Sequence, residues 1–160
     1  MNPTLHPTPD LPREHGIIDD HLERLRAFYE EAGAPPVNRA AQGYRRMLAR
    51  CYALMFPPDA SVLEVGCGGG DLLALLPNRD VTGVDLSPVQ IETAQRRLPH
   101  GRFHVQAGEH LTLDRAFDVI ILSETIKFAA DVQRVIENVV MYRTTRTDPT
   151  PILTNLPWTR

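Results

Sequence analysis

The hydrophobic positions change their spacing near residue 60 of the 160-residue chain. Before that point apolar residues recur at helical intervals, which predicts two helices, at residues 14–32 and 38–56. After it, short apolar runs predict buried strands at residues 61–65, 81–84, 102–105, 117–122 and 152–156. Helical signals return between them, at residues 71–76, 87–98 and 132–140. This order predicts an α/β fold, with a doubly wound, mostly parallel sheet behind an N-terminal helical lead.

Local signals refine two of these helices. Asn38 is the expected cap of the second helix. Ser87 and Gln90 have the spacing of a capping box, with Pro88 in the first helical position. On the second helix, helical spacing predicts an apolar, core-facing side that consists of Tyr44, Met47, Leu48, Cys51, Tyr52 and Met55.

A glycine-rich turn follows the first predicted strand, in the stretch "SVLEVGCGGGDLLALL" at residues 61–76. In a doubly wound sheet, ligands bind outside the carboxyl ends of the strands, so this turn is the expected ligand site. A nucleoside triphosphate is disfavoured because no lysine follows the glycines as a P-loop requires. A dinucleotide is disfavoured because Asp71 stands where the third glycine of that fingerprint would be. A carboxylate there also places negative charge near a pyrophosphate.

Two acidic residues suit a different ligand. Glu64, at the end of the first strand, fits a ligand that carries an ammonium group and no phosphate. S-adenosylmethionine has an amino group, a sulfonium and a ribose diol. Asp85 ends the second strand, 19 residues after Gly66, where it can accept both ribose hydroxyls. That use of an acidic residue is shared with NAD sites, so Asp85 does not distinguish the two cofactors.

The stretches "VLEVGCGGGDLL" and "VTGVDLSPVQIETAQRRLP" resemble motifs I and II of the class I S-adenosylmethionine-dependent methyltransferases. The similarity continues through "FHVQAGEHLTL" and "FDVIILSETIKFAADVQRVIENV", and it spans residues 45–158. It implies a Rossmann-like methyltransferase sheet and S-adenosylmethionine as the cofactor. It does not indicate the methyl acceptor.

The resemblance also implies roles for residues near the methionine end of the cofactor. Gly66 and Gly68 would let the backbone approach it, with Cys67 between them as a small loop residue and not a nucleophile. Glu64 would hold the amino group. Ser123, which follows the fourth strand, would lie near the sulfur.

At the nucleoside end, Asp85 would bind the ribose hydroxyls and Leu86 would pack on the adenine. Gly108 and Glu109 would border the adenine edge. The family often has Asp before that glycine, where this chain has Ala107, so a contact to adenine N6 lacks its usual partner. In many relatives an N-terminal helix closes over the site, and residues 44–46 are the candidate here.

No catalytic residue is assigned. A sulfonium methyl group is already activated, so positioning in a dry site is the main requirement. A general base is needed only for an acceptor that must lose a proton. Two alternatives stay open: an NAD(P)-dependent oxidoreductase, and a non-catalytic cofactor-binding domain that acts with a partner.

The family sheet has seven strands, whereas this chain stops at about the fifth, so we expect a truncated sheet. A homodimer or a partner chain is then expected to cover the exposed edge. The expected domains are a disordered proline-rich tail (1–13), a helical cap (14–57) and an S-adenosylmethionine-binding domain (58–160).

Composition narrows the expected partners and location. The net charge of −3 disfavours nucleic acid, and no apolar run approaches the roughly 18–20 residues of a membrane span. The two cysteines form no metal or disulfide pattern, which favours a cytoplasmic protein without a metal. The expected acceptor is a small molecule.

Overall fold

The computed structural model describes residues 12–32, 39–123, 125–144 and 152–155. The sequence assignments to the first eleven residues, to Asn38 and to the loop before the last strand lie outside the described residues.

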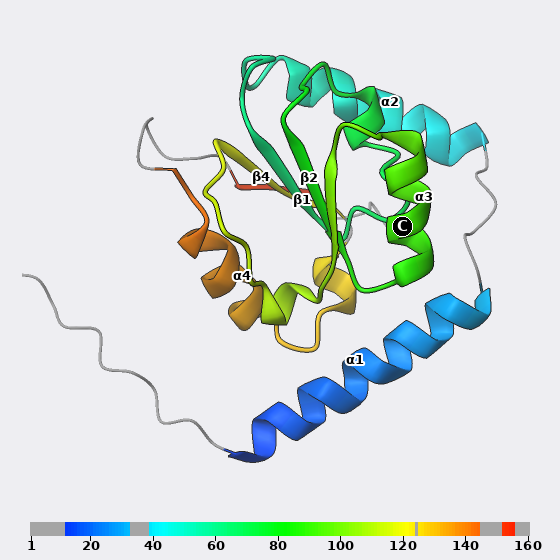
Figure 1. Ribbon diagram of the computed structural model, residues 1–160, viewed down its shortest axis with the longest axis vertical. Coiled ribbons are helices and arrows are strands. Elements are labelled where there is room, and N and C mark those ends of the chain that lie inside the picture. Colours follow the sequence, from blue (N-terminus) through cyan, green and yellow to red (C-terminus); the bar gives the residue numbers. More distant parts are fainter. Residues whose placement is uncertain (1–11, 33–38, 124, 145–151, 156–160) are drawn as a thin grey trace, which may run out of the picture.

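The described strands form one parallel sheet in the order β3-β2-β1-β4-β5, as Figure 1 shows in part. The strands are β1 (Val62–Val65), β2 (Val81–Asp85), β3 (Arg102–Val105), β4 (Val119–Ser123) and β5 (Ile152–Asn155). The chain moves outward from β1 to β3, then crosses back to add β4 and β5 on the other side of β1. This confirms the predicted doubly wound sheet, and it puts the switch in strand order between β1 and β4.

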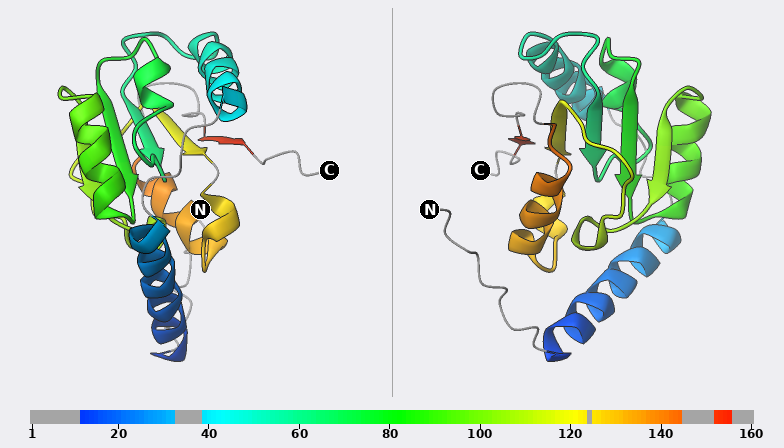
Figure 2. Two further views of the ribbon diagram at one scale, coloured as in Figure 1. Left: turned by 90° about the vertical axis from the view of Figure 1, so that its right-hand side faces the viewer. Right: turned by 60° about the vertical axis from the view of Figure 1, so that its left-hand side comes forward.

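Helices cover both faces of the sheet (Figures 1 and 2). The α-helices are α1 (Pro12–Ala32), α2 (Arg39–Ala53), α3 (Pro88–Arg97) and α4 (Val132–Met141). Single 3₁₀ turns are η1 (Leu73–Leu75), η2 (Gly108–His110) and η3 (Ile126–Phe128). Among the described helices, none combines the length and the hydropathy that a membrane crossing requires.

Alternation along β1 divides the core into two layers. Val62 faces the layer with α2, η1 and α3, where it joins Tyr52 and Ala94. Leu63 and Val65 face the opposite layer, with α4 and its buried Val135. Because neighbouring residues of a strand point to opposite faces, a central strand that is covered on both faces is buried at nearly every position, as β1 is, whereas the edge strand β3 buries only Phe103.

Three predictions from the sequence need correction. The segment 71–76 forms only the turn η1, because the left-handed Gly70 and Pro77 leave little room between them for a helix. Helix α2 ends at Ala53. Its core-facing side is also wrong in part: Met47, Cys51 and Met55 are exposed. Residues that face the sheet must share the side of Ala49 and Tyr52, and those three side chains do not.

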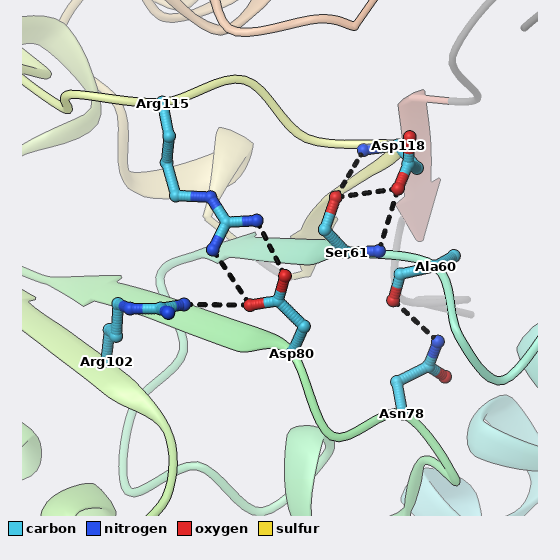
Figure 3. Close-up of polar contacts among 7 residues, drawn as sticks. All are labelled: Ala60, Ser61, Asn78, Asp80, Arg102, Arg115 and Asp118. Atoms are coloured by element: carbon cyan, nitrogen blue, oxygen red, sulfur yellow. Dashed lines mark hydrogen bonds and ion pairs between the residues drawn. The ribbon is translucent and has the colours of Figure 1, made fainter. Parts of the chain in front are cut away.

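The amino ends of the strands are joined by polar contacts (Figure 3). Asp80, before β2, accepts hydrogen bonds from Arg115 at 2.6 and 2.8 Å and from Arg102 at 2.8 Å. The Arg115 hydrogen bonds, with Arg102 contributing, lower the pKa of Asp80. Asp118 accepts from both the backbone and the hydroxyl of Ser61, at 3.0 and 2.8 Å. These contacts lie at the end of the sheet away from the glycine turn.

We expect Arg115→Gln to destabilise the protein near neutral pH by up to about 1 kcal/mol, because the Asp80 pair is partly exposed. The folded-state pKa of Asp80 is lowered, so its contribution is complete above the ordinary aspartate range and disappears as pH falls through the folded pKa. Urea unfolding between acid and neutral pH measures this difference. The neighbouring exposed Arg79→Gln is the control, and an equal loss in both variants would contradict the role of the pair.

Candidate functional site

The turn after β1 bends back on the sheet through three glycines. Gly66, Gly68 and Gly70 have φ values of 76°, 51° and 71°, a region that other residues rarely adopt. At Gly66 space is limiting as well, since a Cβ there would lie 1.7 Å from Oγ1 of Thr125. The same hydroxyl donates a 2.7 Å hydrogen bond to the carbonyl of Val65. The first glycine is therefore required both by its backbone angle and by Thr125.

A cavity of about 400 Å³ opens at this turn, along the carboxyl ends of the strands. The side of the sheet contributes Glu64, Gly66, Cys67, Gly68, Asp85, Leu86, Gly108 and Glu109 to its wall. The structure thus brings together eight of the nine cofactor-binding residues expected from the sequence. The ninth, Ser123, ends β4, and its side chain is outside the described part of the chain.

Glu64 is a buried carboxylate in the cavity wall. It is 2% exposed, and its Oε2 has no hydrogen-bond partner among the described residues. Burial, followed by the charge of Asp85, raises its pKa well above the usual range, while Arg45 acts in the opposite direction. A carboxylate held in this way gains most from a cation that enters the cavity.

Asp85 ties the glycine turn to helix α3. Its Oδ2 accepts from the backbone of Gly68 at 2.8 Å, and its Oδ1 accepts from the backbone of Ser87 at 2.9 Å. Burial raises the pKa of Asp85, against the lowering effect of these hydrogen bonds. The backbone of Leu86 also contributes a hydrogen bond that lowers this pKa, and the carboxylate retains acceptor capacity for a ligand hydroxyl.

The capping box at the start of α3 is only half formed. Ser87 accepts from the backbone of Gln90 at 3.4 Å, as predicted. In a complete capping box, the side chain of Gln90 would accept from the backbone N–H of Ser87. That hydrogen bond is absent in the described structure, because this N–H donates to Asp85 instead. Gln90 instead lines the cavity.

The residues at the other end of the cavity are held mainly by structural contacts. Glu109 is 4% exposed, and its Oε1 accepts from the backbone of Ala130 at 2.9 Å. Asn138 donates to the carbonyls of Gly108 and Glu109, at 3.1 and 2.6 Å. These bonds fix the loop after β3 against α4. Ala107, Gly108 and Glu109 line the cavity at this end.

Cys67 is buried, and burial raises the pKa of its thiol well above the usual range. The thiol donates weakly to the carbonyl of Gly68 at 3.4 Å. A buried thiol with a raised pKa suits a small loop residue better than a nucleophile.

Helices α1 and α2 cover the cavity on the side away from the sheet, and we call these lining residues its roof: Leu22, Leu25, Tyr29, Tyr44 and Arg45. The sequence predicted this roof only in part. Tyr44 and Arg45 line it as the resemblance implies, whereas Arg46 does not. Helix α1, which lies across the carboxyl-end edge of the sheet (Figure 2), adds Leu22, Leu25 and Tyr29. The apolar spacing of α1 was visible in the sequence, but its position over the cavity depends on tertiary contacts.

Two of those contacts join α1 to η3. His21 Nε2 lies 3.0 Å from the carbonyl of Phe128. The rings of Tyr29 and Phe128 meet edge to face, with centroids 6.1 Å apart. Phe128 follows β4 and also lines the cavity, so α1 and η3 together form part of its wall.

Asp71, the residue that disfavours a dinucleotide, is paired with arginine. Its Oδ1 lies 2.8 Å from Arg97, and its Oδ2 lies 3.9 Å from Arg45. Arg97 also donates to the carbonyl of Gly69. The sequence signalled Asp71 but not its partners, since Arg45 and Arg97 come from helices that meet only in the folded chain.

Comparisons with known proteins agree with this geometry. Residues 62–146 match a family model described as a methyltransferase domain. The malonyl-[acyl-carrier protein] O-methyltransferase of Anoxybacillus flavithermus is 29% identical over 136 residues, which cover 81% of this chain and 51% of that protein. The trans-aconitate 2-methyltransferase of Methylobacterium radiotolerans is 33% identical over 73 residues, 43% of this chain and 28% of that protein.

Solved structures show the same fold. An N-methyltransferase of Bradyrhizobium japonicum in complex with S-adenosyl-L-homocysteine aligns with a TM-score of 0.62 at 22% identity, covering 80% of this chain and 68% of that one. The chain spans about half, or less, of the curated relatives it matches. It belongs to the family of methyltransferase domains, and the expected class I methyltransferase fold is confirmed.

We expect Glu64→Gln to raise the free energy of unfolding of the ligand-free protein near neutral pH, by on the order of 1 kcal/mol. The folded-state pKa of Glu64 is raised, so the wild type is fully stable below the ordinary glutamate range and loses stability as pH rises towards the folded pKa. The difference between variant and wild type should therefore vanish in acid. Chemical unfolding across that pH range measures it.

The exposed Glu23→Gln on α1 is the matched control and should change stability little at any pH. A Glu64→Gln protein that is less stable than the wild type at neutral pH would show that Glu64 supports the fold in its charged form.

Proposed function

We propose that this domain binds S-adenosylmethionine in the 400 Å³ cavity and transfers its methyl group to a small-molecule acceptor. The observation that carries the proposal is the buried Glu64, whose Oε2 lacks a partner among the described residues. Family membership supports the same reaction class.

The residues present fit this cofactor. Its ammonium group would meet Glu64, and a ribose hydroxyl would donate to the remaining acceptor capacity of Asp85. Its carboxylate needs a cation, which Arg45 and Arg97 supply in the described wall. The bare backbone at Gly66 and Gly68 allows close approach. We place the adenine against Leu86, where it would be bordered by Gly108 and Glu109.

When bound, the cofactor supplies a sulfonium methyl group for in-line displacement. The chain itself positions the cofactor and keeps water out of the site. The glycine turn and Asp85 orient the cofactor, while Leu22, Leu25 and Tyr29 of α1 exclude water from the cavity. Among the described lining residues there is no histidine. The activity therefore suits an acceptor that is already nucleophilic, or one whose proton leaves to solvent.

The two curated relatives named above indicate the acceptor only loosely. One carries the name of an O-methyltransferase for malonyl-[acyl-carrier protein], and the other that of a 2-methyltransferase for trans-aconitate. We infer a small organic acceptor for this domain, a cytoplasmic location, and a homodimer or partner chain along β5. In the described sheet, β5 has β4 as its neighbour on one side. We keep the domain limits proposed from the sequence, a helical cap at 14–57 and a cofactor-binding domain at 58–160; Tyr52 of the cap packs in the same core layer as Val62 of the sheet.

Isothermal titration of the purified chain with S-adenosylhomocysteine tests the proposal. We expect saturable binding, weakened by about tenfold or more in Glu64→Gln, because a charge-assisted hydrogen bond is lost. Glu64 is the better target than Asp85, since Asp85→Asn would also disturb the backbone bonds to Gly68 and Ser87.

Glu23→Gln should bind like the wild type, and NAD⁺ should not bind. Folded protein that binds NAD⁺ and not S-adenosylhomocysteine would overturn the assignment in favour of an oxidoreductase. Normal binding without transfer to any carboxylic acid, amine or hydroxyl acceptor would instead favour the non-catalytic alternative.

A further inference from the structure

A second, smaller pocket of about 170 Å³ lies behind the wall of the cofactor cavity. Helix α2 provides Gln42, Arg45 and Arg46, the turn η1 provides Ala74 and Leu75, and Asp71 and Arg97 complete the lining. Three of these residues, Arg45, Asp71 and Arg97, also line the larger cavity. Arg46 and Gln42 line only the smaller one.

The charges in this pocket do not balance. Three guanidinium groups face one carboxylate, which leaves an excess of two positive charges. Asp71 already forms an ion pair with Arg97 at 2.8 Å. Its ion pair with Arg45, at 3.9 Å, is therefore a second and longer contact. Arg46 and Gln42 have no side-chain hydrogen bond or ion pair within the described part of the chain. Helix α2 contains no acidic residue that would neutralise them.

We propose that this pocket binds a phosphate group of a ligand other than the cofactor. In the ligand-free protein, a phosphate dianion matches the excess of two charges that the lining leaves. Guanidinium groups present paired N–H donors in the planar arrangement that phosphate oxygens accept. The unpaired amide of Gln42 adds a further donor. The pocket volume is sufficient for a tetrahedral anion with part of its hydration shell.

The shared wall places this site next to the amino-acid end of the proposed cofactor. Arg46, however, faces only the smaller pocket, so it separates the two sites experimentally. The phosphate proposal does not rest on the proposed methyl transfer, because the lining of the smaller pocket is present in the ligand-free protein. Since Arg45 and Arg97 would also hold the cofactor carboxylate, bound cofactor should weaken the binding of phosphate, while Arg46 and Gln42 keep a separate contact to it.

Titration of the full chain with inorganic phosphate at constant ionic strength, followed by ³¹P nuclear magnetic resonance, tests the proposal. We expect saturable binding that Arg46→Gln weakens by about tenfold or more. Arg50→Gln is the matched control: Arg50 is exposed on the same helix but outside the pocket, and its loss should change the affinity less than about twofold. Glycerol 3-phosphate, run in parallel, should show the same dependence on Arg46.

A titration in the presence of saturating S-adenosylhomocysteine completes the test. Retained phosphate binding supports a separate site. Complete competition would overturn it, since the anion would then occupy the position of the cofactor carboxylate. Equal losses in Arg46→Gln and Arg50→Gln would also overturn it, because they would show a diffuse surface attraction and not a pocket. Circular dichroism of both variants verifies that each is folded.

Discussion

The carboxylate of Asp85 holds together the elements on which the site depends. It accepts one backbone N–H from the glycine turn and another from the residue that caps α3. The preceding carbonyl, of Val84, accepts from Gly66 and Cys67 at 2.7 and 3.0 Å. The end of β2 therefore fixes the course of the chain after β1. A turn with three left-handed glycines has little rigidity of its own, and these bonds supply it.

Stability and function occupy opposite ends of the sheet. At the amino ends, Asp80 is paired with Arg102 and Arg115, and Asp118 is satisfied by Ser61. At the carboxyl ends, Glu64 is buried with an oxygen that has no hydrogen-bond partner among the described residues, and burial raises its pKa. A buried, partly uncompensated charge lowers stability, but it prepares the cavity for a cation. The two ends differ in that the cavity of about 400 Å³ opens at the carboxyl ends.

Most of the fold was accessible from the sequence because parallel strands buried on both faces leave a clear pattern. All five strands were placed within a few residues, and Ser87 was correctly identified as the cap of α3. Predictions failed where several positions suit the same pattern. On α2, both Met47 and Leu48 fit helical spacing, and only the docking of the helix decides which faces the sheet. At 71–76, helical composition yielded to a left-handed glycine and a proline at its two ends.

The sequence by itself determined the glycine turn, the acidic residues at the ends of β1 and β2, and the alternation of strands and helices that predicts a parallel sheet with these residues at one edge. These are local features whose spacing reflects backbone geometry. Only the tertiary structure decided what surrounds them. The roof of α1, the contact of Thr125 with Gly66, and the meeting of Arg45, Arg46 and Arg97 around Asp71 join residues far apart in the chain. Such contacts depend on how helices dock, for which the spacing of residues along one helix carries no information.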